Sequence, residues 1–539
     1  MPHCARRPAP HRQPAHHVAG ERAGAALYRH HILNSAFSST PGRNVGGLIS
    51  VAAGASLACA FAPLGYWPLA ILAPAVLIWL WEGAAPLRAA WLGLCFAAGT
   101  FAAGTYWLYI SIHVFGEAPI WLAFAIMGAL IAIMASYHAL LGYVVARWLP
   151  ASGTWRWLIG IPAAWLFSEW WRGWFLSGFP WLSLGYSQSD TWLASLAPVV
   201  GVYGLSALLL LSSGALFTLW RGKRKQRIAA AIVLVLPWLA ALLLARVEWT
   251  RSSGEAVSIA ILQGAIPQDM KWQANNLQHT LDLYADLNEQ ALGAQLIVWP
   301  EAAAPDLANN LTKYLGEIHS RSARNGSDVV MGVVRVDDDG ERYFNSMLAL
   351  GPTVQFYDKG HLVPFGEYFP VPAFVRSWLR LMSLPYSDFT AGAARQAPLQ
   401  AAGIKLAASI CYEDAYATSQ LAAVRASGML VNVTNDAWFG RSSARHQHFQ
   451  IARLRAIEAQ RYLLRAANDG ITAVIGPRGQ VVAQAPQFEP AVLRASAVPR
   501  GGVTPFLRFG NWPVITLASL AFGLALRRQR TTNPRRTST

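Results

Sequence analysis

Three residues in the second half of the chain have side chains suited to acyl-transfer chemistry. Cys411 closes a strand-like segment, KLAASIC, and is followed by Tyr412, Glu413 and a predicted helix. A cysteine on a strand-to-helix turn lies at the edge of a sheet, where backbone N–H groups of the helix can lower a thiol pKa and bind an oxyanion. Taken alone, Cys411 also fits a buried structural cysteine.

Glu301 follows QLIVWP (295–300) at the end of another predicted strand. Partial desolvation beside Trp299 and Pro300 raises the pKa of a carboxylate, which suits it to accept a thiol proton near neutral pH. The alternative is a solvated loop or helix-cap glutamate.

Lys359 lies in the loop FYDKGHLVPFGE (356–367), which is bounded by Gly and Pro. An ammonium beside a thiol and a carbonyl can stabilise both the thiolate and a tetrahedral oxyanion. Most loop lysines are simply solvated, so Lys359 gains significance only in combination. Glu301, Lys359 and Cys411 together predict a Glu-Lys-Cys arrangement across one domain.

The segment that contains these residues alternates strand-like and helix-like stretches, which predicts an α/β domain. Helical stretches are predicted around Leu277, Leu281, Tyr284 and Leu287 and, as one long helix, at 445–466. Strands are predicted at 257–264, 295–300, 328–334, 346–350, 405–411, 429–434, 471–475 and 491–497.

The rest of the 539-residue chain is strongly apolar: only 13% of the whole sequence is charged, whereas soluble domains have about 25%. Eight apolar runs predict eight transmembrane helices, because buried core helices would not follow one another with so few charges between them. The runs lie at 45–63, 67–82, 89–111, 119–145, 156–174, 194–219, 228–247 and 511–526.

The formal net charge of +16 comes almost entirely from three basic segments, 1–44, 221–227 and 527–536. Two of them adjoin apolar runs, which is typical of the cytoplasmic side of a membrane rather than of a nucleic-acid surface. We therefore expect no nucleic-acid partner, both termini in the cytoplasm and the α/β domain outside it.

The expected organisation is an α-helical membrane bundle plus one exported domain. Its parts are a disordered basic tail (1–44), transmembrane helices 1–7 (45–247), the catalytic domain (248–508), transmembrane helix 8 (509–526) and a basic cytoplasmic tail (527–539).

Neither disulfides nor metals are expected in the α/β domain. Of the four cysteines only Cys411 lies in it, and CxxC spacing is absent. His446 and His448 form an H-x-H pair without a carboxylate or cysteine at ligand spacing, so we assign no metal. Trp438, in NDAWFG, is expected to pack in its turn.

Several sequence motifs resemble those of a known family. WPE (299–301), K-x-H-L-V-P-F-G-E (359–367) and ICYE (410–413) resemble the nitrilase, or carbon-nitrogen hydrolase, superfamily. With eight predicted spans the chain resembles its membrane-bound branch, the apolipoprotein N-acyltransferases. The resemblance covers roughly residues 45–526. It extends through GFPWLSLGYSQ (178–188), LAPVVGVYG (196–204), QGAIPQDMKW (263–272), NDAWFG (435–440), ITAVIGPRG (471–479) and GNWP (510–513).

This resemblance implies an αββα sandwich and a role for each matching residue. Glu301 would be the general base, Lys359 the oxyanion-stabilising group and Cys411 the nucleophile. Glu367 would support the triad, with Tyr412 and Glu413 beside the nucleophile. Trp272 would lie on a mobile loop near the lipid entrance.

The implied reaction is the last step of lipoprotein maturation: N-acylation of the diacylglyceryl-cysteine of apolipoproteins through a thioester acyl-enzyme. The implied donor is a phospholipid, phosphatidylethanolamine, and no cofactor is expected. Together with the charge pattern, the resemblance implies a multi-pass protein of the bacterial inner membrane with a periplasmic catalytic domain.

Two alternatives stay open: a membrane-tethered amidase or nitrilase that uses the same triad, and a transporter or scaffold whose α/β domain only binds. Glu169 and Arg172, near the end of a span, are among the few charges a transport pathway could use.

Overall fold

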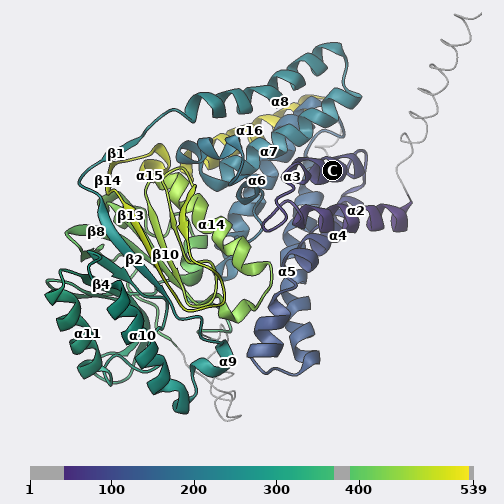
Figure 1. Ribbon diagram of the computed structural model, residues 1–539. Helices are drawn as coiled ribbons and strands as arrows, with labels where there is room; N and C mark the ends of the chain where they lie inside the picture. Colours follow the sequence, from purple (N-terminus) through teal and green to yellow (C-terminus); the bar gives the residue numbers. More distant parts are fainter. Residues whose placement is uncertain (1–41, 369–388, 533–539) are drawn as a thin grey trace, which may run out of the picture. The chain divides into compact units, whose positions relative to one another are not determined.

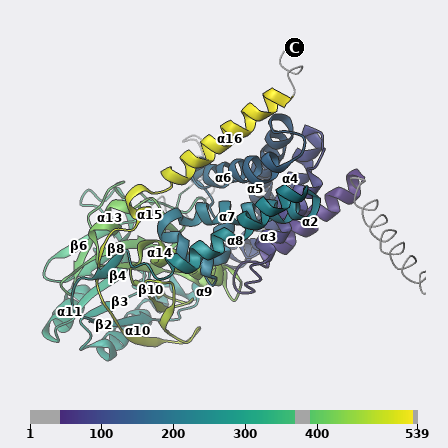
Figure 2. The same cartoon turned by 90° about the horizontal axis from the view of Figure 1, so that it is seen from above.

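The structure is a computed structural model that describes residues 42–368 and 389–532. Most of the predicted N-terminal tail and the last seven residues lie outside these ranges. The described chain folds into a part made of helices and a part built on two β-sheets (Figures 1 and 2). Figure 1 shows α10 and α11 on the far side of the sheets from the helical part, and α14 on the near side.

A helix lies at each of the eight predicted apolar runs. The helices are α2 (Arg43–Ala58), α3 (Leu69–Leu80), α4 (Pro86–Gly104), α5 (Ile120–Trp148), α6 (Ile161–Arg172), α7 (Ala197–Arg221), α8 (Arg224–Leu244) and α16 (Trp512–Thr532). Within the described ranges, four segments are helical, long and apolar enough to cross a bilayer. They are Pro86–Gly104, Ile120–Trp148, Trp192–Arg221 and Arg224–Leu244. Some predicted runs exceed their helices: the one at 156–174 divides into a π-helical turn, η2 (Arg156–Gly160), and α6.

Glu169 and Arg172, at the end of α6, hold the loop that leads to α7. Arg172 Nη1 donates to the carbonyl oxygens of Phe179 and Trp181, both at 2.6 Å. The Leu184 N–H donates to Glu169 Oε1 at 3.1 Å. Both side chains are buried. The two charges flagged as possible parts of a transport pathway therefore fix the conformation of the loop at 178–184.

The α/β part contains two six-stranded sheets. One has the order β13-β2-β3-β4-β5-β6 and the other β12-β11-β10-β9-β8-β7. A two-stranded ribbon, β1 with β14, lies where the chain leaves and re-enters the helical part. The strands are β1 (Thr250–Ser252), β2 (Val257–Gln263), β3 (Leu296–Val298), β4 (Asp328–Val336), β5 (Tyr343–Leu350), β6 (Val354–Asp358), β7 (Leu399–Ala401), β8 (Ile404–Ile410), β9 (Met429–Thr434), β10 (Leu463–Ala467), β11 (Ala473–Ile475), β12 (Val481–Gln484), β13 (Ala491–Ala497) and β14 (Arg500–Gly502).

Alternation along the strands builds the layers. In β2, Ile259 and Ile261 face the second sheet, while Ala260 and Leu262 pack against α10. The outer helices are α10 (Leu277–Ala291) and α11 (Thr312–Arg324) on the first sheet, with α13 (Leu421–Ala426) and α14 (Ala444–Ala459) on the second. Short helices α9 (Gln268–Lys271) and α15 (Pro505–Phe509) complete the part. The expected αββα sandwich is confirmed, because period-2 strands can bury one face against a sheet and the other against helices.

The long helix predicted at 445–466 was wrong at its end. α14 stops at Ala459, Gln460 is left-handed with φ of 46°, and β10 follows as a parallel neighbour of β9. The apolar Leu463 and Leu464 are buried in sheet contacts instead of on a helix face. Helix and strand periods are hard to separate in a short apolar run that continues a helix.

Candidate active site

Cys411 lies at the carboxyl end of β8, a central strand paired in parallel with β9. It begins the 3-10 turn η7 (Cys411–Ala415), and its φ is +51°, in the left-handed region. A non-glycine residue in that region is uncommon and often marks a functional turn. The predicted strand-to-helix junction is therefore present.

Glu301 lies beyond the carboxyl end of β3 and is only 7% exposed. The neighbouring strand β4 passes unusually close to it, because a Cβ placed on Gly332 would lie 2.5 Å from Glu301 Cα. Only glycine permits that approach without displacing the backbone. Through it the Gly332 N–H donates to the Pro300 carbonyl at 3.1 Å, which fixes the turn that carries Glu301.

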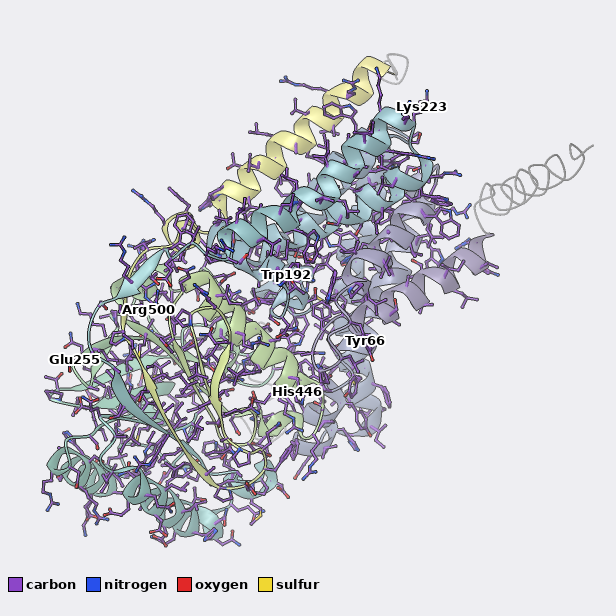
Figure 3. The ribbon with its side chains drawn as sticks, turned by 45° about the horizontal axis from the view of Figure 1, so that its top comes forward. Tyr66, Trp192, Lys223, Glu255, His446 and Arg500 are labelled. Carbon is purple, nitrogen blue, oxygen red and sulfur yellow. The ribbon has the colours of Figure 1, made fainter. Side chains whose placement is uncertain are left out.

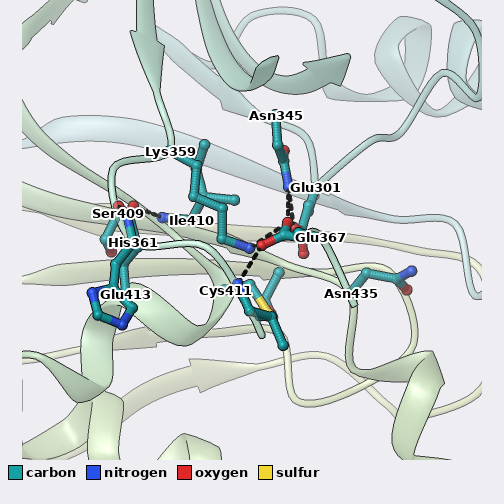
Figure 4. A network of polar contacts seen from close by, with 12 residues as sticks. Glu301, Asn345, Lys359, His361, Glu367, Ser409, Ile410, Cys411, Glu413 and Asn435 are labelled. Atoms are coloured by element: carbon teal, nitrogen blue, oxygen red, sulfur yellow. Dashed lines mark hydrogen bonds and ion pairs between the residues drawn. The ribbon is translucent and has the colours of Figure 1, made fainter. Parts of the chain in front are cut away.

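Lys359 follows β6, is 1% exposed and joins two carboxylates. Its Nζ lies 2.8 Å from Glu367 Oε1 and 3.5 Å from Glu301 Oε1. Asn345, on β5, bridges the same pair: its Nδ2 donates to Glu301 Oε1 at 2.8 Å and to Glu367 Oε1 at 2.9 Å. Figure 4 shows these side chains converging beside Cys411. We call Glu301, Asn345, Lys359 and Glu367 the carboxylate–lysine cluster.

Burial and charge set the resting protonation of the site. Burial lowers the pKa of Lys359, but Glu367 and Glu301 raise it more, so the pKa lies above its ordinary value and the side chain is cationic. Burial, reinforced by the Glu301 charge, raises the pKa of Cys411. The expectation of a lowered thiol pKa was therefore wrong, because desolvation outweighs Lys359 and the helix N–H groups. The resting thiol is protonated and needs a base.

Glu413 connects the Lys359 loop to β8, the strand that Cys411 follows. Its Oε1 accepts from the Gly360 N–H at 2.7 Å and the His361 N–H at 3.1 Å, and its Oε2 accepts from the Ile410 N–H at 2.8 Å. Burial raises the pKa of this carboxyl. Its oxygens are occupied by backbone donors, so Glu413 holds loops in place rather than facing a substrate.

Tyr412 connects the Cys411 turn to the helical part. Its ring stacks on Trp181 with centroids 6.2 Å apart, and its hydroxyl donates to the Gly178 carbonyl at 3.2 Å. Tyr416 donates to the same carbonyl at 2.9 Å, and Tyr186 donates to the Ala415 carbonyl at 3.2 Å. The turn that carries Cys411 is thus bonded to the segment between α6 and α7.

Trp272, at the end of α9, is 52% exposed. The preceding Lys271 is buried, and its Nζ donates to the Glu301 carbonyl oxygen at 3.0 Å. Burial lowers the pKa of Lys271 to about 8. The apolar Trp272 ring faces outward on a segment anchored to the Glu301 turn.

Several residues of the site were not found from the sequence. Asn345 gave one usable signal, an amide within the apolar strand YFNSMLAL, whereas Lys271 gave none. His448 pairs with two aspartates in a buried network.

Among the described residues no group of His, Cys, Asp and Glu side chains is arranged to hold a metal ion. Trp438 is 39% exposed, and the neighbouring Phe439 packs on Trp107. The packing role expected for Trp438 stays a prediction.

Two family models match the chain. Residues 53–215 match the apolipoprotein N-acyltransferase N-terminal domain, and residues 258–502 match the carbon-nitrogen hydrolase family. The chain is 41% identical to the apolipoprotein N-acyltransferase of Methylococcus capsulatus over 90% of its own length and 96% of that protein. It is 40% identical to that of Pseudomonas syringae pv. tomato over 89% and 96%. The chain belongs to the apolipoprotein N-acyltransferase family.

It is accordingly an acyltransferase whose α/β part has the nitrilase-like fold. Among solved structures, the chain is similar to the C. elegans NitFhit protein, with 18% identity and a TM-score of 0.37. That match covers 53% of this chain and 66% of the other. The three strings that predicted the site, at 299–301, 359–367 and 410–413, all lie within the residues that match the carbon-nitrogen hydrolase family.

Proposed function

We propose that this acyltransferase moves a fatty acyl chain from a phospholipid, phosphatidylethanolamine, to the α-amine of the diacylglyceryl-modified N-terminal cysteine of apolipoproteins. The reaction runs in two half-reactions through a thioester on Cys411. The observation that carries the proposal is that Glu301 and Lys359 lie beside Cys411. The turn that begins with Cys411 is itself hydrogen-bonded to the helical part.

In the first half-reaction Glu301 removes the Cys411 proton as the sulfur attacks the ester carbonyl carbon. The carbonyl electron pair moves to oxygen, where Lys359 and backbone N–H groups stabilise it. The oxyanion collapses, the carbon–oxygen ester bond breaks, and the leaving alkoxide takes the proton held by Glu301. The products are a lysophospholipid and an acyl-cysteine. Glu367 keeps Lys359 in place throughout.

In the second half-reaction the neutral α-amine of the apolipoprotein attacks the thioester carbon. Glu301 accepts a proton from the amine nitrogen, the carbon–sulfur bond breaks, and the departing thiolate recovers that proton. An amide forms, and the thiol is restored for the next cycle. Because thiolates are better leaving groups than amines, collapse of the intermediate favours the amide.

A membrane location suits these substrates. Withdrawing an acyl chain of about sixteen carbons from a bilayer costs on the order of 10 kcal/mol, at about 0.8 kcal/mol per CH₂ group. An active site at the bilayer surface avoids that cost. The bonds from Tyr412 and Tyr416 to Gly178 keep the nucleophile turn next to the helices that would contact lipid. In this proposal the exposed ring of Trp272 contacts the acyl chains of the substrates; its 52% exposure supports that role.

We propose further that all eight helices span the inner membrane of a bacterial cell, with 248–508 in the periplasm and both termini in the cytoplasm. Helices shorter than about 20 residues span with the help of their flanking turns. Lys223, in the basic segment between α7 and α8, lies at the end of the helices away from the sheets (Figure 3). Trp192 lies at the end beside them. This separation fits the positive-inside rule.

The test is direct detection of the thioester. The purified full-length protein is incubated with phosphatidylethanolamine labelled in its acyl chain, without apolipoprotein, and analysed for an adduct that hydroxylamine removes. We expect one adduct on Cys411 and none after Cys411→Ala, while Cys59→Ala, a control outside the site, keeps it. An unlabelled wild-type protein, or an equal adduct in Cys411→Ala, contradicts the proposal. Release of ammonia from small amides instead would favour a membrane-tethered amidase.

A further inference from the structure

Behind the nucleophile turn lies a network of four charged side chains from four different elements. Asp414 belongs to η7, Asp436 to η8 (Asp436–Phe439), His448 to α14 and Arg465 to β10. Each side chain is at most 1% exposed. Arg465 donates to Asp436 Oδ2 at 2.9 Å and to Asp414 Oδ2 at 3.3 Å. We call this group the buried ion network.

The geometry makes His448 an imidazolium. Its Nδ1 lies 2.8 Å from Asp436 Oδ1, and its Nε2 lies 3.0 Å from Asp414 Oδ1. Ionised carboxylates only accept hydrogen bonds, so both ring nitrogens carry a proton. Arg465 Nη2 lies 3.0 Å from Nδ1, and both groups point to Asp436. Burial and Arg465 lower the pKa of His448, but the two aspartates raise it more, to about 9.

His448 also reaches the nucleophile itself. Its Nε2 lies 3.2 Å from the carbonyl oxygen of Cys411. That oxygen belongs to the peptide group whose other end is the Tyr412 N–H. The Tyr412 N–H lies in the first turn of η7, where backbone donors have no acceptor within the helix. In hydrolases with a nucleophile on a sharp strand-to-helix turn, the N–H after the nucleophile serves as an oxyanion donor.

A cation bonded to one end of a peptide group strengthens the donor at its other end. Hydrogen bonds in a chain polarise one another, and bonds from charged donors are the stronger ones. Asn432 Nδ2 also approaches the Cys411 carbonyl, at 3.4 Å, but as a neutral and more distant donor. His448 is therefore the charged group acting on this peptide.

The helical part fixes the rotation of α14 that brings His448 to this place. Gln447, the preceding residue, accepts from the indole N–H of Trp181 at 2.7 Å and from that of Trp107 at 3.2 Å. The His448 ring lies 5.7 Å from the Trp181 ring. His446, two residues earlier on α14, is partly exposed and contributes nothing to the network.

We propose that His448 is a positioning residue for acyl transfer: it polarises the Cys411–Tyr412 peptide so that the Tyr412 N–H stabilises the oxyanion together with Lys359. This inference rests on the proposed function. A residue that only supported the fold would affect every reaction of the Cys411 thiol alike. His448 acts on the oxyanion and leaves the nucleophilicity of the Cys411 thiol unchanged.

The test compares two reactions of the same thiol in the full-length protein. Acylation by labelled phosphatidylethanolamine passes through an oxyanion, whereas alkylation by iodoacetamide displaces iodide without one. The variants are His448→Asn, which removes the donor to the Cys411 carbonyl, and His448→Gln, whose amide nitrogen can replace Nε2. His446→Asn is the matched control on the same helix.

We expect His448→Asn to lower the single-turnover acylation rate about tenfold, because it weakens one oxyanion donor whose complete loss costs 10²- to 10³-fold. The KM for phospholipid and the alkylation rate stay within about twofold of wild type. His448→Gln restores most of the acylation rate, and His446→Asn changes neither reaction.

Three outcomes for His448→Asn overturn the inference. They are an acylation rate equal to that of the wild type, an equal loss of rate in acylation and alkylation, and a raised KM with an unchanged maximal rate. If His448→Asn does not fold, the same comparison is made with His448→Leu, whose side chain has no donor: its acylation must fall by more than its alkylation, and an equal fall in both reactions contradicts the inference. Absence of the adduct in the wild-type protein would instead reject the proposed function.

Discussion

Two polar groups flank the Cys411 turn, and they differ in charge balance. The carboxylate–lysine cluster holds two carboxylates, Glu301 and Glu367, around the single ammonium of Lys359. The buried ion network pairs two carboxylates with two cations, Arg465 and the His448 imidazolium. The first group borders the Cys411 side chain (Figure 4), and the second contacts the Cys411 backbone.

The difference shows where charge imbalance is tolerated. A carboxylate that shares one ammonium with another keeps the capacity to accept a proton, which a base requires. Complete pairing suits a group that exchanges no proton, because an unpaired charge in a dry interior is costly. Two carboxylates therefore share one cation beside the Cys411 side chain, where a proton is to be accepted, and two cations behind the Cys411 backbone, where the charges stay fixed.

The largest effect separates the two groups by activity. Glu301→Gln should slow acylation of Cys411 by up to about ten thousandfold, since general-base catalysis contributes up to that factor. The melting temperature should change by less than about 2 °C, because Lys359 keeps Glu367 and the amide oxygen can still accept from Asn345. Adduct formation and thermal unfolding measure the two quantities. Glu289→Gln, on the surface, is the control, and an undiminished acylation rate would assign the base to another group.

The second effect separates them by stability. Asp436→Asn leaves the two buried cations of the network, His448 and Arg465, to share the single carboxylate of Asp414, which costs about 3–5 kcal/mol of unfolding free energy. Thermal unfolding of the full-length protein should show this loss, whereas Glu289→Gln, which breaks the exposed pair with Arg321, leaves the transition unchanged. Equal transitions for Asp436→Asn and wild type would show that the network is not a stabilising unit.

The smallest effect is a pH dependence of stability. The pKa of His448 is raised to about 9 in the fold from an ordinary 6.5. The imidazolium therefore contributes fully below pH 6.5, and its contribution is lost as the pH rises through 9. Linkage puts it at about 2–3 kcal/mol at pH 7. The unfolding midpoint of the wild type should fall between pH 7 and 9.5, and that of His448→Gln should stay flatter. Parallel curves would exclude His448 as the titrating group.

Local sequence predicted the parts of the site that depend on one element at a time. Cys411 and Glu301 each stand at the end of an apolar strand, and the ends of strands bounded by polar or turn residues can be recognised from alternation alone. Lys359 and Glu367 were found through the string around them. Asn345 and Lys271 escaped, because nothing within their own segments indicates which distant side chain they contact.

His448 illustrates the same limit from the other direction. The pair with His446 suggested a metal site to be weighed, and spacing on a helix gave no means of telling the two histidines apart. The hydrogen bonds from Trp181 and Trp107 to Gln447 fix the rotation of α14. This rotation turns the His448 ring toward Asp414 and leaves the His446 ring partly exposed. The direction of the Cys411 pKa shift was missed because burial is a property of the whole fold.

The sequence by itself indicated the division into apolar helices and an α/β domain and the placement of Cys411 and Glu301 at strand ends, because these follow from periodicity and composition over short windows. The αββα layering and the combination of Glu301, Lys359 and Cys411 as a triad came from the resemblance to a family. The tertiary structure alone decided which charges are paired, which are left unbalanced beside the sulfur and which loop of the helical part holds the nucleophile turn. Those outcomes depend on contacts between residues hundreds of positions apart, and Coulomb and desolvation energies are set by distance in space rather than along the chain.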